Sequence, residues 1–431
     1  MNLKGFTNSK LIVVLRKKKH VRYLMLSKLV NRIGSSLYNL ALLTLASKQT
    51  YSTLAISLVN LLGNIPSLID PILAYLTDRE TKRLKKATLL NTIQVVTYVM
   101  ITFLMLKYQM PLAIFVLILL ANVLSDSLDG YISNMFAPFS KTWIAQDERR
   151  SLASLDIVLF SLSVVVGQLL GAGWLVLFPD QFFSLSLINA LTFTLSLFFL
   201  KKIKFNDSVK MTESAKKQIS VRDFFKKMNS AYTHMRKRHV LQTIWILAFC
   251  KAEYASYILL LNVAMVSVNN LRFGSYSQTL VVLQIVTFVG LILGSFFRIN
   301  RLEKISYGQL NMLVSGTIII MTICSLYELP LIFILIFKLI GTFLSGYIAP
   351  KYYADLIQSI DEEQLTRVES LNGFILMLSA PLGALQATFC LHFFSLKTSW
   401  LLELVALVLF TMITELMFYR KKVSSQKRLF K

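Results

Sequence analysis

The sequence has few of the residues that build covalent scaffolds or metal centres. Its 431 residues include three cysteines and four histidines. Cys250, Cys324 and Cys390 lie in apolar stretches and form no Cys-x-x-Cys pair, which excludes a disulfide framework and a cysteine-built metal site. A phosphate-binding Gly-x-x-x-x-Gly-Lys-Ser/Thr loop is also missing, and no Ser-His-Asp or metal-ligand constellation stands out. We therefore expect no enzyme, no metal site, no cofactor and no ATP hydrolysis by this chain.

Acidic residues are scarce as well. The chain has 22 Asp and Glu against 46 Lys and Arg, a net charge of +24. A soluble nucleic-acid-binding protein would carry such a charge on a water-exposed face, but only 16% of the residues are charged, where soluble proteins average about 25%. The chain is instead 55% apolar, with a mean hydropathy of +0.60. This composition is typical of a polytopic membrane protein.

Continuous apolar runs, each long enough to cross about 30 Å of hydrocarbon, recur along the sequence. They lack the alternation of lipid-facing β-strands, so we expect helices. The first 22 residues are basic and lack a compact apolar core with a cleavage site, so we expect no removable signal peptide. The twelve predicted spans are 23–46, 53–77, 87–107, 111–136, 151–178, 182–200, 241–267, 276–297, 307–327, 330–356, 367–394 and 398–419.

The basic residues are distributed unevenly between the two sides of these spans. If both termini are cytoplasmic, 38 of the 46 Lys and Arg lie in inside segments and 4 in outside loops. The positive-inside rule therefore predicts a multi-pass protein of the cell membrane with both termini in the cytoplasm. The charge is explained by topology and by membrane lipids, and we expect no nucleic-acid partner.

One inside segment is much longer than the others and divides the spans six and six. Residues 201–240 carry twelve Lys and Arg, and apolar residues from Val221 to Met235 recur at helical spacing, which predicts an amphipathic helix on the membrane surface. A linker that only satisfies topology and touches anionic lipid is the alternative to a regulatory domain. The predicted domains are a six-helix bundle at 1–200, this linker at 201–240 and a second bundle at 241–431.

The two halves of the sequence match each other at one fixed offset, essentially half the length of the chain. When Gly383 is laid over Gly167, segment 363–371 falls on 147–155. The same offset places 290–294 over 74–78. Two distant matches at one offset predict duplicated six-span halves, a plan in which transporters place their substrate site between the halves.

These features resemble the major facilitator superfamily, and more closely its macrolide-efflux-like drug exporters, from about Arg22 to Tyr419. The resemblance implies an all-α membrane protein with twelve transmembrane helices in two pseudo-symmetric six-helix halves, the major facilitator fold. The motifs that carry it are Arg32–Leu37, Asp78–Arg83, Asp147–Arg150, Asp361–Arg367 and Pro381–Gly383.

The family's signature after its second span is Gly-x-Leu-Ala-Asp-Arg-x-Gly-Arg-Lys. Residues 74–83 replace both glycines but keep the acid and the bases. The resemblance implies that these form a charged clamp that gates the conformational change; the alternative is that they only fix topology. The implied gate residues are Asp78, Arg79, Lys82 and Arg83. Drug antiporters of the family usually carry an arginine in span four, where this chain has Asp126.

Ionisable side chains inside the spans are the next candidates, because each is costly in a bilayer unless it is paired or wet. At a helical rise of about 1.5 Å per residue, Arg32, Asp70 and Asp126 are expected at a similar depth, so that Arg32 neutralises one acid and the other titrates. Glu253 is expected near mid-membrane. The candidates for coupling or substrate binding are Arg32, Asp70, Asp126, Asp129, Lys251, Glu253 and Lys338, whereas Lys28, Asp156, Asp355, Glu403 and Glu415 are expected nearer the interfaces.

Two interpretations of these charges stay open. Asp126 and Glu253 are the leading candidates for proton or substrate-cation coupling, because burial favours a protonated carboxyl. Alternatively the charges form structural ion pairs, Arg32 with Asp126 or Asp70 and Glu253 with Lys338.

One motif suggests an enzyme. Glu362-Glu363-x-x-x-Arg367 matches the Glu-Glu-x-x-x-Arg sequence of intramembrane abortive-infection-type proteases. The acidic pair lies in a predicted loop instead of a span, and the four histidines fit none of the patterns that this chemistry needs, so we expect no protease.

The sequence and the resemblance together predict a secondary transporter. It would export a small hydrophobic, drug- or antibiotic-like substrate by alternating access, coupled to protons by antiport, and act as a monomer. One alternative is an exporter of an endogenous lipid, peptide or metabolite. Another is a transporter-like membrane protein that serves as an immunity factor, sensor or scaffold without turnover.

Overall fold

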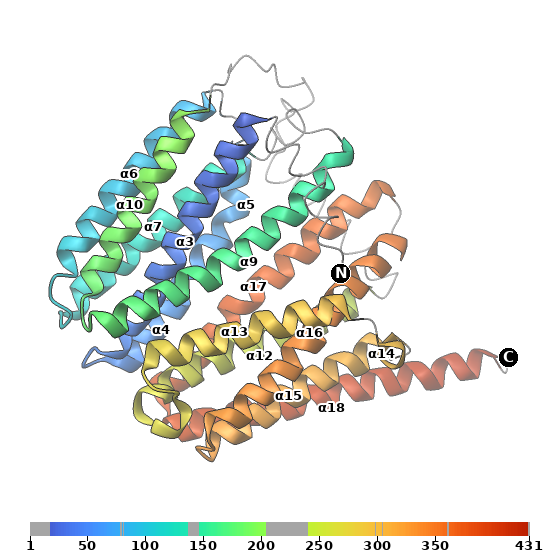
Figure 1. Ribbon diagram of the computed structural model, residues 1–431. Coiled ribbons are helices and arrows are strands. Elements are labelled where there is room, and N and C mark those ends of the chain that lie inside the picture. Colours follow the sequence, from blue (N-terminus) through green and yellow to red (C-terminus); the bar gives the residue numbers. More distant parts are fainter. Residues whose placement is uncertain are drawn as a thin grey trace. The chain divides into compact units, whose positions relative to one another are not determined.

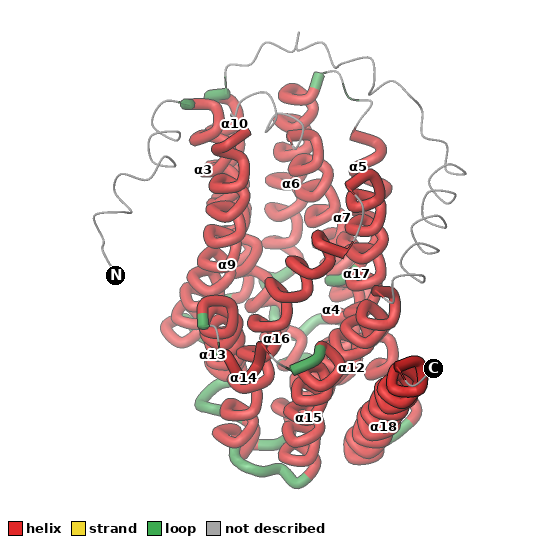
Figure 2. Tube along the Cα trace, turned by 90° about the vertical axis from the view of Figure 1, so that its right-hand side faces the viewer, coloured by secondary structure: helices red, strands yellow, loops and turns green. Residues whose placement is uncertain are grey.

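The computed structural model describes residues 18–77, 80, 82–136, 146–203, 240–297, 299–303, 305–359 and 362–429. Within these ranges all regular structure is helical (Figure 2). Eleven helical segments there are long and apolar enough to cross a membrane. The one predicted span not among these eleven is the first, 23–46, which corresponds to helix α3 (Lys19–Ser47); this helix is long enough but more polar, since it carries Lys28 and Arg32. The predicted linker helix between Val221 and Met235 lies outside the described residues.

The chain divides into two compact units, Met1–Lys217 and Gln218–Lys431. In unit 1, α3 packs against α9 and α10, α10 packs against α6, and α7 packs against α5 and α6 (Figure 1). Its second span is broken at Gly63 into two helices. The helices of unit 1 are α3 (Lys19–Ser47), α4 (Ser52–Leu62), α5 (Ile65–Thr77), α6 (Arg83–Leu104), α7 (Leu112–Phe136), α9 (Gln146–Leu177) and α10 (Phe182–Lys201).

Unit 2 repeats this packing pattern with its own helices. Helix α12 packs against α17, as α3 packs against α9 in unit 1. Helix α15 packs against α18, as α6 packs against α10. Helix α13 packs against α16, as α5 packs against α7. The two units are therefore pseudo-symmetric. The helices of unit 2 are α12 (Val240–Ser267), η2 (Asn269–Leu271), α13 (Tyr276–Phe296), α14 (Asn300–Glu303), α15 (Tyr307–Leu326), α16 (Leu331–Ser359), α17 (Glu362–Phe393) and α18 (Leu396–Leu429).

The sequence offset between the halves corresponds to one helix crossing that occurs in both units. A Cβ atom at Gly167 of α9 would lie 2.8 Å from the Cβ of Ser36 on α3. A Cβ atom at Gly383 of α17 would overlap the carbonyl oxygen of Ala252 on α12. Ser36 and Ala252 are themselves related by the same offset as the two glycines. Glycine at these crossings therefore lets two helix backbones come into direct contact, as small residues do in membrane proteins.

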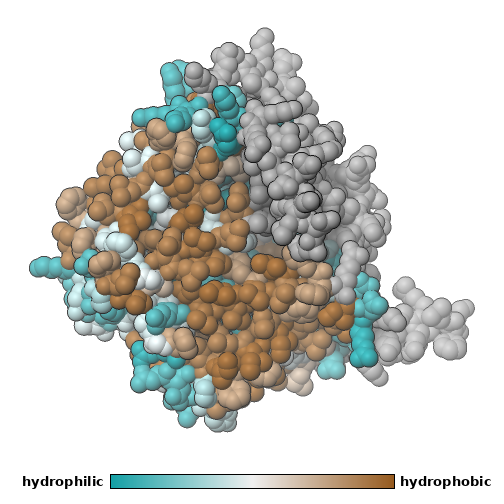
Figure 3. All heavy atoms as spheres, viewed as in Figure 1, coloured by the Kyte–Doolittle hydropathy of each residue, from teal (hydrophilic) through white to brown (hydrophobic). Residues whose placement is uncertain are grey.

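The surfaces of both units are rich in apolar side chains. Phe103, Leu177 and Phe296 are each more than two-thirds exposed. On the face shown in Figure 3, hydrophobic residues cover the middle stretches of the helices, and hydrophilic residues gather near their ends. Such a distribution fits contact with lipid hydrocarbon along the helices and with water at their ends.

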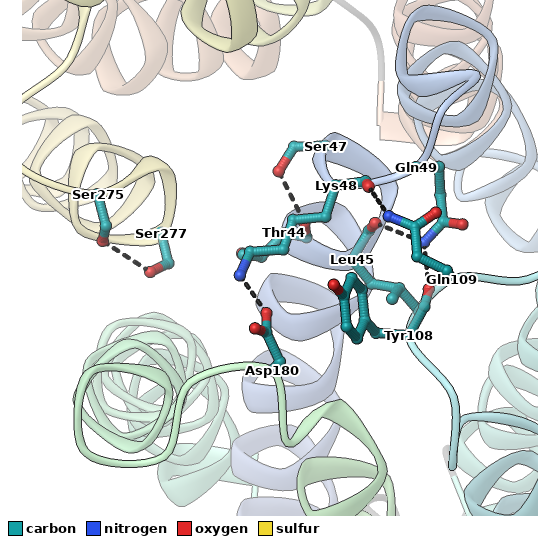
Figure 4. Close-up of polar contacts among 10 residues, drawn as sticks. All are labelled: Thr44, Leu45, Ser47, Lys48, Gln49, Tyr108, Gln109, Asp180, Ser275 and Ser277. Carbon is teal, nitrogen blue, oxygen red and sulfur yellow. Dashed lines mark hydrogen bonds and ion pairs between the residues drawn. The ribbon is translucent and has the colours of Figure 1, made fainter.

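Three connections of unit 1 are tied together at one end of its helices (Figure 4). Gln49 Nε2 donates to the carbonyl oxygen of Tyr108 over 2.6 Å, and Gln109 Nε2 donates to the carbonyl oxygen of Lys48 over 2.7 Å. Lys48 also forms an ion pair with Asp180. The connections after α3, α6 and α9 therefore share one end, as helices that cross a membrane alternately require.

One detail of the sequence interpretation is wrong. Glu362 and Glu363, expected in a loop, instead begin helix α17. The apolar part of this helix begins only at Leu371, so the acidic pair still precedes the predicted span.

Candidate functional site

An ion pair in unit 1 joins α3 to α9. Arg32 Nη1 donates to Asp156 Oδ1 over 2.7 Å, and Arg32 Nη2 donates to Asp156 Oδ2 over 3.2 Å. The guanidinium and the carboxylate therefore form a bidentate ion pair. The expected pairing of Arg32 with Asp70 or Asp126 is wrong, since none of the ion pairs among the described residues joins them. The reason is that α9 packs along α3 and brings Asp156, which was expected near an interface, to this arginine.

Asp126 on α7 ends a chain of hydrogen bonds. Tyr98 Oη donates to Asn122 Oδ1 over 2.7 Å, and Asn122 Nδ2 donates to Asp126 Oδ2 over 3.0 Å. Tyr38 packs edge-on against Tyr98, with ring centres 4.9 Å apart, and its hydroxyl has no hydrogen-bond partner among the described residues. In the part of unit 1 that the structure describes, no cation forms an ion pair with Asp126. Its carboxyl can therefore bind a proton without breaking an ion pair.

The other two candidate acids of unit 1 also have amide partners. Asn31 Nδ2 donates to Asp129 Oδ1 over 3.3 Å, and Asn134 Nδ2 donates to Asp70 Oδ1 over 2.8 Å. Lys28 lies close enough to interact electrostatically with Asp129. The acids of α5 and α7 are thus held mainly by side-chain amides.

In unit 2, Glu253 of α12 is 1% exposed and belongs to a group of polar side chains from three helices. Gln386 Nε2, on α17, lies 3.4 Å from Glu253 Oε2 and 3.3 Å from Glu403 Oε2, on α18. Ser256 Oγ donates to Glu403 Oε2 over 2.6 Å. Glu403, expected near an interface, is instead 3% exposed. The structure therefore places a second buried carboxyl beside Glu253.

The two candidate lysines of unit 2 are not part of this group. Lys338 is buried and donates to the hydroxyl of Tyr254. Lys251 is exposed, although it lies close in sequence to the buried Glu253. The alternative that Glu253 pairs with Lys338 is wrong, because no ion pair among the described residues joins them.

The predicted gate is described only in part. Asp78 and Arg79 lie outside the described residues. Lys82 is exposed, whereas Arg83 is buried and its Nη1 donates to the carbonyl oxygen of Met135 over 2.8 Å. Arg83 thus joins the start of α6 to the end of α7, and the clamp role of all four residues stays a prediction.

Glu80 adds an ionised group next to Arg83 and Lys82. It forms an ion pair with Lys86 and accepts a hydrogen bond from Tyr131 Oη over 2.6 Å. Burial alone would raise the pKa of Glu80, but the hydrogen bonds from Lys86 and Tyr131 hold that pKa below its ordinary value. The ionised Glu80 therefore stabilises the folded state at neutral pH, and this contribution is lost as the pH falls through the lowered pKa.

This arrangement predicts a pH-dependent difference in stability. On acidification, the melting temperature of the wild type should fall more steeply than that of Glu80→Gln, since the variant has no ion pair to lose. Thermal unfolding of the purified protein in detergent measures both slopes. Glu328→Gln, at an exposed turn of unit 2, serves as the control and should keep the wild-type slope. Equal slopes for Glu80→Gln and wild type would contradict the prediction.

Two cavities, one in each unit, do not reach the candidate carboxyls Asp126, Glu253 and Glu403, although the one in unit 1 touches Lys86 and Tyr131 beside Glu80. One, of about 570 Å³, is lined by residues 267–270, Glu328 and 395–397 of unit 2. Another, of about 540 Å³, is lined mainly by apolar side chains of α5, α6 and α7. Asp126, Glu253 and Glu403 do not line either of these two cavities. Glu253 and Glu403 are buried between helices, whereas Asp126 is half-buried.

Solved structures of transporters match nearly the whole chain. A POT family transporter in complex with 5-aminolevulinic acid has a TM-score of 0.67 at 11% identity, over 93% of this chain and 96% of that one. A peptide transporter POT in complex with alafosfalin has a TM-score of 0.65 at 13% identity, over 94% and 95%. The nucleoside transporter NupG has a TM-score of 0.63 at 12% identity, over 92% and 100%. The chain has the major facilitator fold.

At these identities the likeness concerns the fold. It supports the major facilitator resemblance of the sequence but does not single out macrolide-efflux-like exporters within it. The similar structures are membrane transporters rather than enzymes. No family model and no curated protein sequence matches the chain.

Sequence reasoning missed Asp156, Glu403 and Gln386. The first two were recognised as charged but were judged by depth alone, which says nothing about which helices pack together. Gln386 was not considered, because only ionisable residues were sought. A side-chain amide inside an apolar span is itself a signal, since it needs a polar partner on a neighbouring helix.

Proposed function

We propose that this protein is a secondary active transporter that moves small molecules across the membrane by alternating access, coupled to protons. The observation that carries the proposal is a set of carboxyl groups embedded in apolar helices of a transporter fold. The foremost are Asp126 in unit 1 and Glu253 in unit 2. Among the described residues, an amide nitrogen donates to each of them and no cation forms an ion pair with either.

The partners matter because a buried carboxylate is costly unless a cation neutralises it. Asp156 has such a cation in Arg32, so protonation of Asp156 would break a bidentate ion pair. Among the described residues, the half-buried Asp126 and the buried Glu253 have none, and a proton is the smallest cation that can neutralise them. We therefore assign coupling to Asp126 and Glu253 and a structural role to the Arg32–Asp156 pair.

For the substrate we propose a small hydrophobic compound of the drug or antibiotic type, exported in exchange for inward protons. The resemblance to macrolide-efflux-like exporters supports this choice. A polar solute is the second candidate. Its support is that similar structures include a peptide transporter, a nucleoside transporter and a transporter in complex with 5-aminolevulinic acid.

The test is flux in proteoliposomes across a small panel of compounds: erythromycin and tetraphenylphosphonium as hydrophobic probes, a dipeptide and uridine as polar ones. Each is measured with and without an imposed pH gradient. We expect gradient-dependent flux of a hydrophobic probe. Gradient-dependent flux of only the dipeptide or uridine would favour the second candidate. Absence of flux for every probe would favour a non-transporting sensor, immunity or scaffold protein.

A further inference from the structure

Glu253 and Glu403 form a pair of carboxyl groups with a single amide between them. Their Oε2 atoms lie 3.4 and 3.3 Å from the same nitrogen, Gln386 Nε2. The two carboxyls are also close enough to hydrogen-bond to each other when one of them is protonated. Since one residue comes from α12, one from α17 and one from α18, the group links three helices of unit 2.

Hydrogen-bond donors are too few for two ionised carboxylates at this place. Both glutamates are almost completely buried. Beyond Gln386, the donor to the pair is Ser256 Oγ, which serves Glu403 Oε2. Glu403 Oε1 is buried and has no donor among the described residues. A carboxyl proton on Glu253 would supply the donor that this oxygen lacks.

The other titratable groups near the pair bring no positive charge to it. The Cys250 thiol on α12 contacts Ser315 Oγ of α15 at 3.3 Å, and Cys390 lies on α17 near both carboxyls. Lys251 is exposed, and the ammonium of Lys338 on α16 is bound to Tyr254. In the described part of unit 2, therefore, no ion pair neutralises either glutamate.

Two carboxylates side by side in a medium of low dielectric cannot both stay ionised at modest cost, so such pairs share a proton. We propose that Glu253 and Glu403 hold one proton between them at neutral pH, and that this pair is the proton-binding site of unit 2. This inference deepens the proposed proton coupling, on which its role in transport rests.

The proton balance of the site suggests how it couples to movement. In the occupied state, the O–H of one carboxyl donates to the other carboxylate, and the pair carries one negative charge. Release passes that proton to water and leaves two negative charges, which only hydration can stabilise. The proton can therefore leave only when the packing of α12, α17 and α18 opens to water, and its return favours the closed packing.

The test is infrared spectroscopy of the full-length protein in detergent at neutral pH, without substrate. We expect a carboxylic-acid carbonyl band in the wild type. The part of this band that comes from the pair should be lost in the double variant Glu253→Gln/Glu403→Gln, and lost or shifted in frequency in each single variant, whereas any part that comes from a protonated Asp126 should stay. Glu415→Gln, at an exposed position of the same helix α18, should leave the band unchanged. Melting temperatures of all variants check that they fold.

Several results would overturn the assignment. One is a band that survives unchanged in a folded double variant, and another is a band whose frequency neither single variant alters. A measurement on the wild type alone adds a third: if sodium chloride, compared with potassium chloride, raises the melting temperature and this rise disappears in Glu403→Gln, the pair is a sodium site. If proton-coupled flux is observed but this band is absent, the shared proton is rejected and the proposed transport function stands. If the band is observed but no flux is, the shared proton stands and the proposed transport function is rejected.

Discussion

Replacing Gly383 by alanine should destabilise unit 2 by about 1–3 kcal/mol, the usual cost of overpacking a tight contact. The added methyl group would overlap the carbonyl oxygen of Ala252, which is backbone and has no rotamer that avoids the contact. Helices α12 and α17 must then separate. Thermal unfolding in detergent should show a lower melting temperature than that of the wild type.

The same helix offers a matched control at Gly373. A Cβ atom there would meet nothing within 4 Å, and alanine is a better helix former than glycine by up to about 1 kcal/mol. Gly373→Ala should therefore be neutral or stabilising. In unit 1, Gly167→Ala should destabilise and Gly173→Ala should not, because only Gly167 contacts a neighbouring helix. Equal effects of Gly383→Ala and Gly373→Ala would show that the close crossing is not what requires glycine.

Asp126→Asn and Glu253→Gln should each abolish flux driven by a pH gradient, down to the level of liposomes without protein. Each change keeps the shape of the side chain and removes its ability to bind a proton. Neither breaks an ion pair among the described residues, because Asp126 accepts a hydrogen bond from Asn122, and Glu253 lies against Gln386 and Glu403. Proteoliposomes with matched protein content measure the flux, and circular dichroism checks folding.

Each of these variants has a control in its own unit. Asp180→Asn changes a surface acid of unit 1 at a residue with φ of 65°, a conformation that asparagine tolerates well. Its ion pair with Lys48 is exposed and contributes little. Glu415→Gln is the control for unit 2. Both controls should transport at nearly the wild-type rate. If Asp126→Asn and Glu253→Gln also keep gradient-driven flux, these carboxyls do not carry the coupling proton.

The architecture could be predicted from the sequence because each membrane-spanning helix must meet requirements that are visible in its own residues. A span must be apolar over a length fixed by the bilayer, so its residues reveal it. The repeat was visible in two distant segment matches at one offset, and that offset also places Gly383 over Gly167, the glycines of the corresponding helix crossings. The break of the second span at Gly63 was not predicted, because the sequence is hydrophobic on both sides of it and does not show that one helical turn is interrupted.

The candidate site was predicted only in part. That Asp126 and Glu253 are ionisable and lie inside spans follows from hydrophobicity and position. Their partners do not, because depth along one helix does not fix its rotation or its neighbours. Arg32 could reach acids of several helices at one depth, and the packing of α3 on α9 selected Asp156. Likewise, Glu403 lies close to the start of α18 and yet meets Glu253 near the middle of α12.

If this chain exchanges substrate for protons, substrate movement alone must move protons in the opposite direction. Proteoliposomes that contain a pH-sensitive dye receive tetraphenylphosphonium or erythromycin on the outside, with no initial pH gradient. Antiport predicts that entry of the compound drives protons out, so that the lumen becomes alkaline, and that Asp126→Asn abolishes this change. Entry of the compound with an unchanged or acidified lumen would contradict the account.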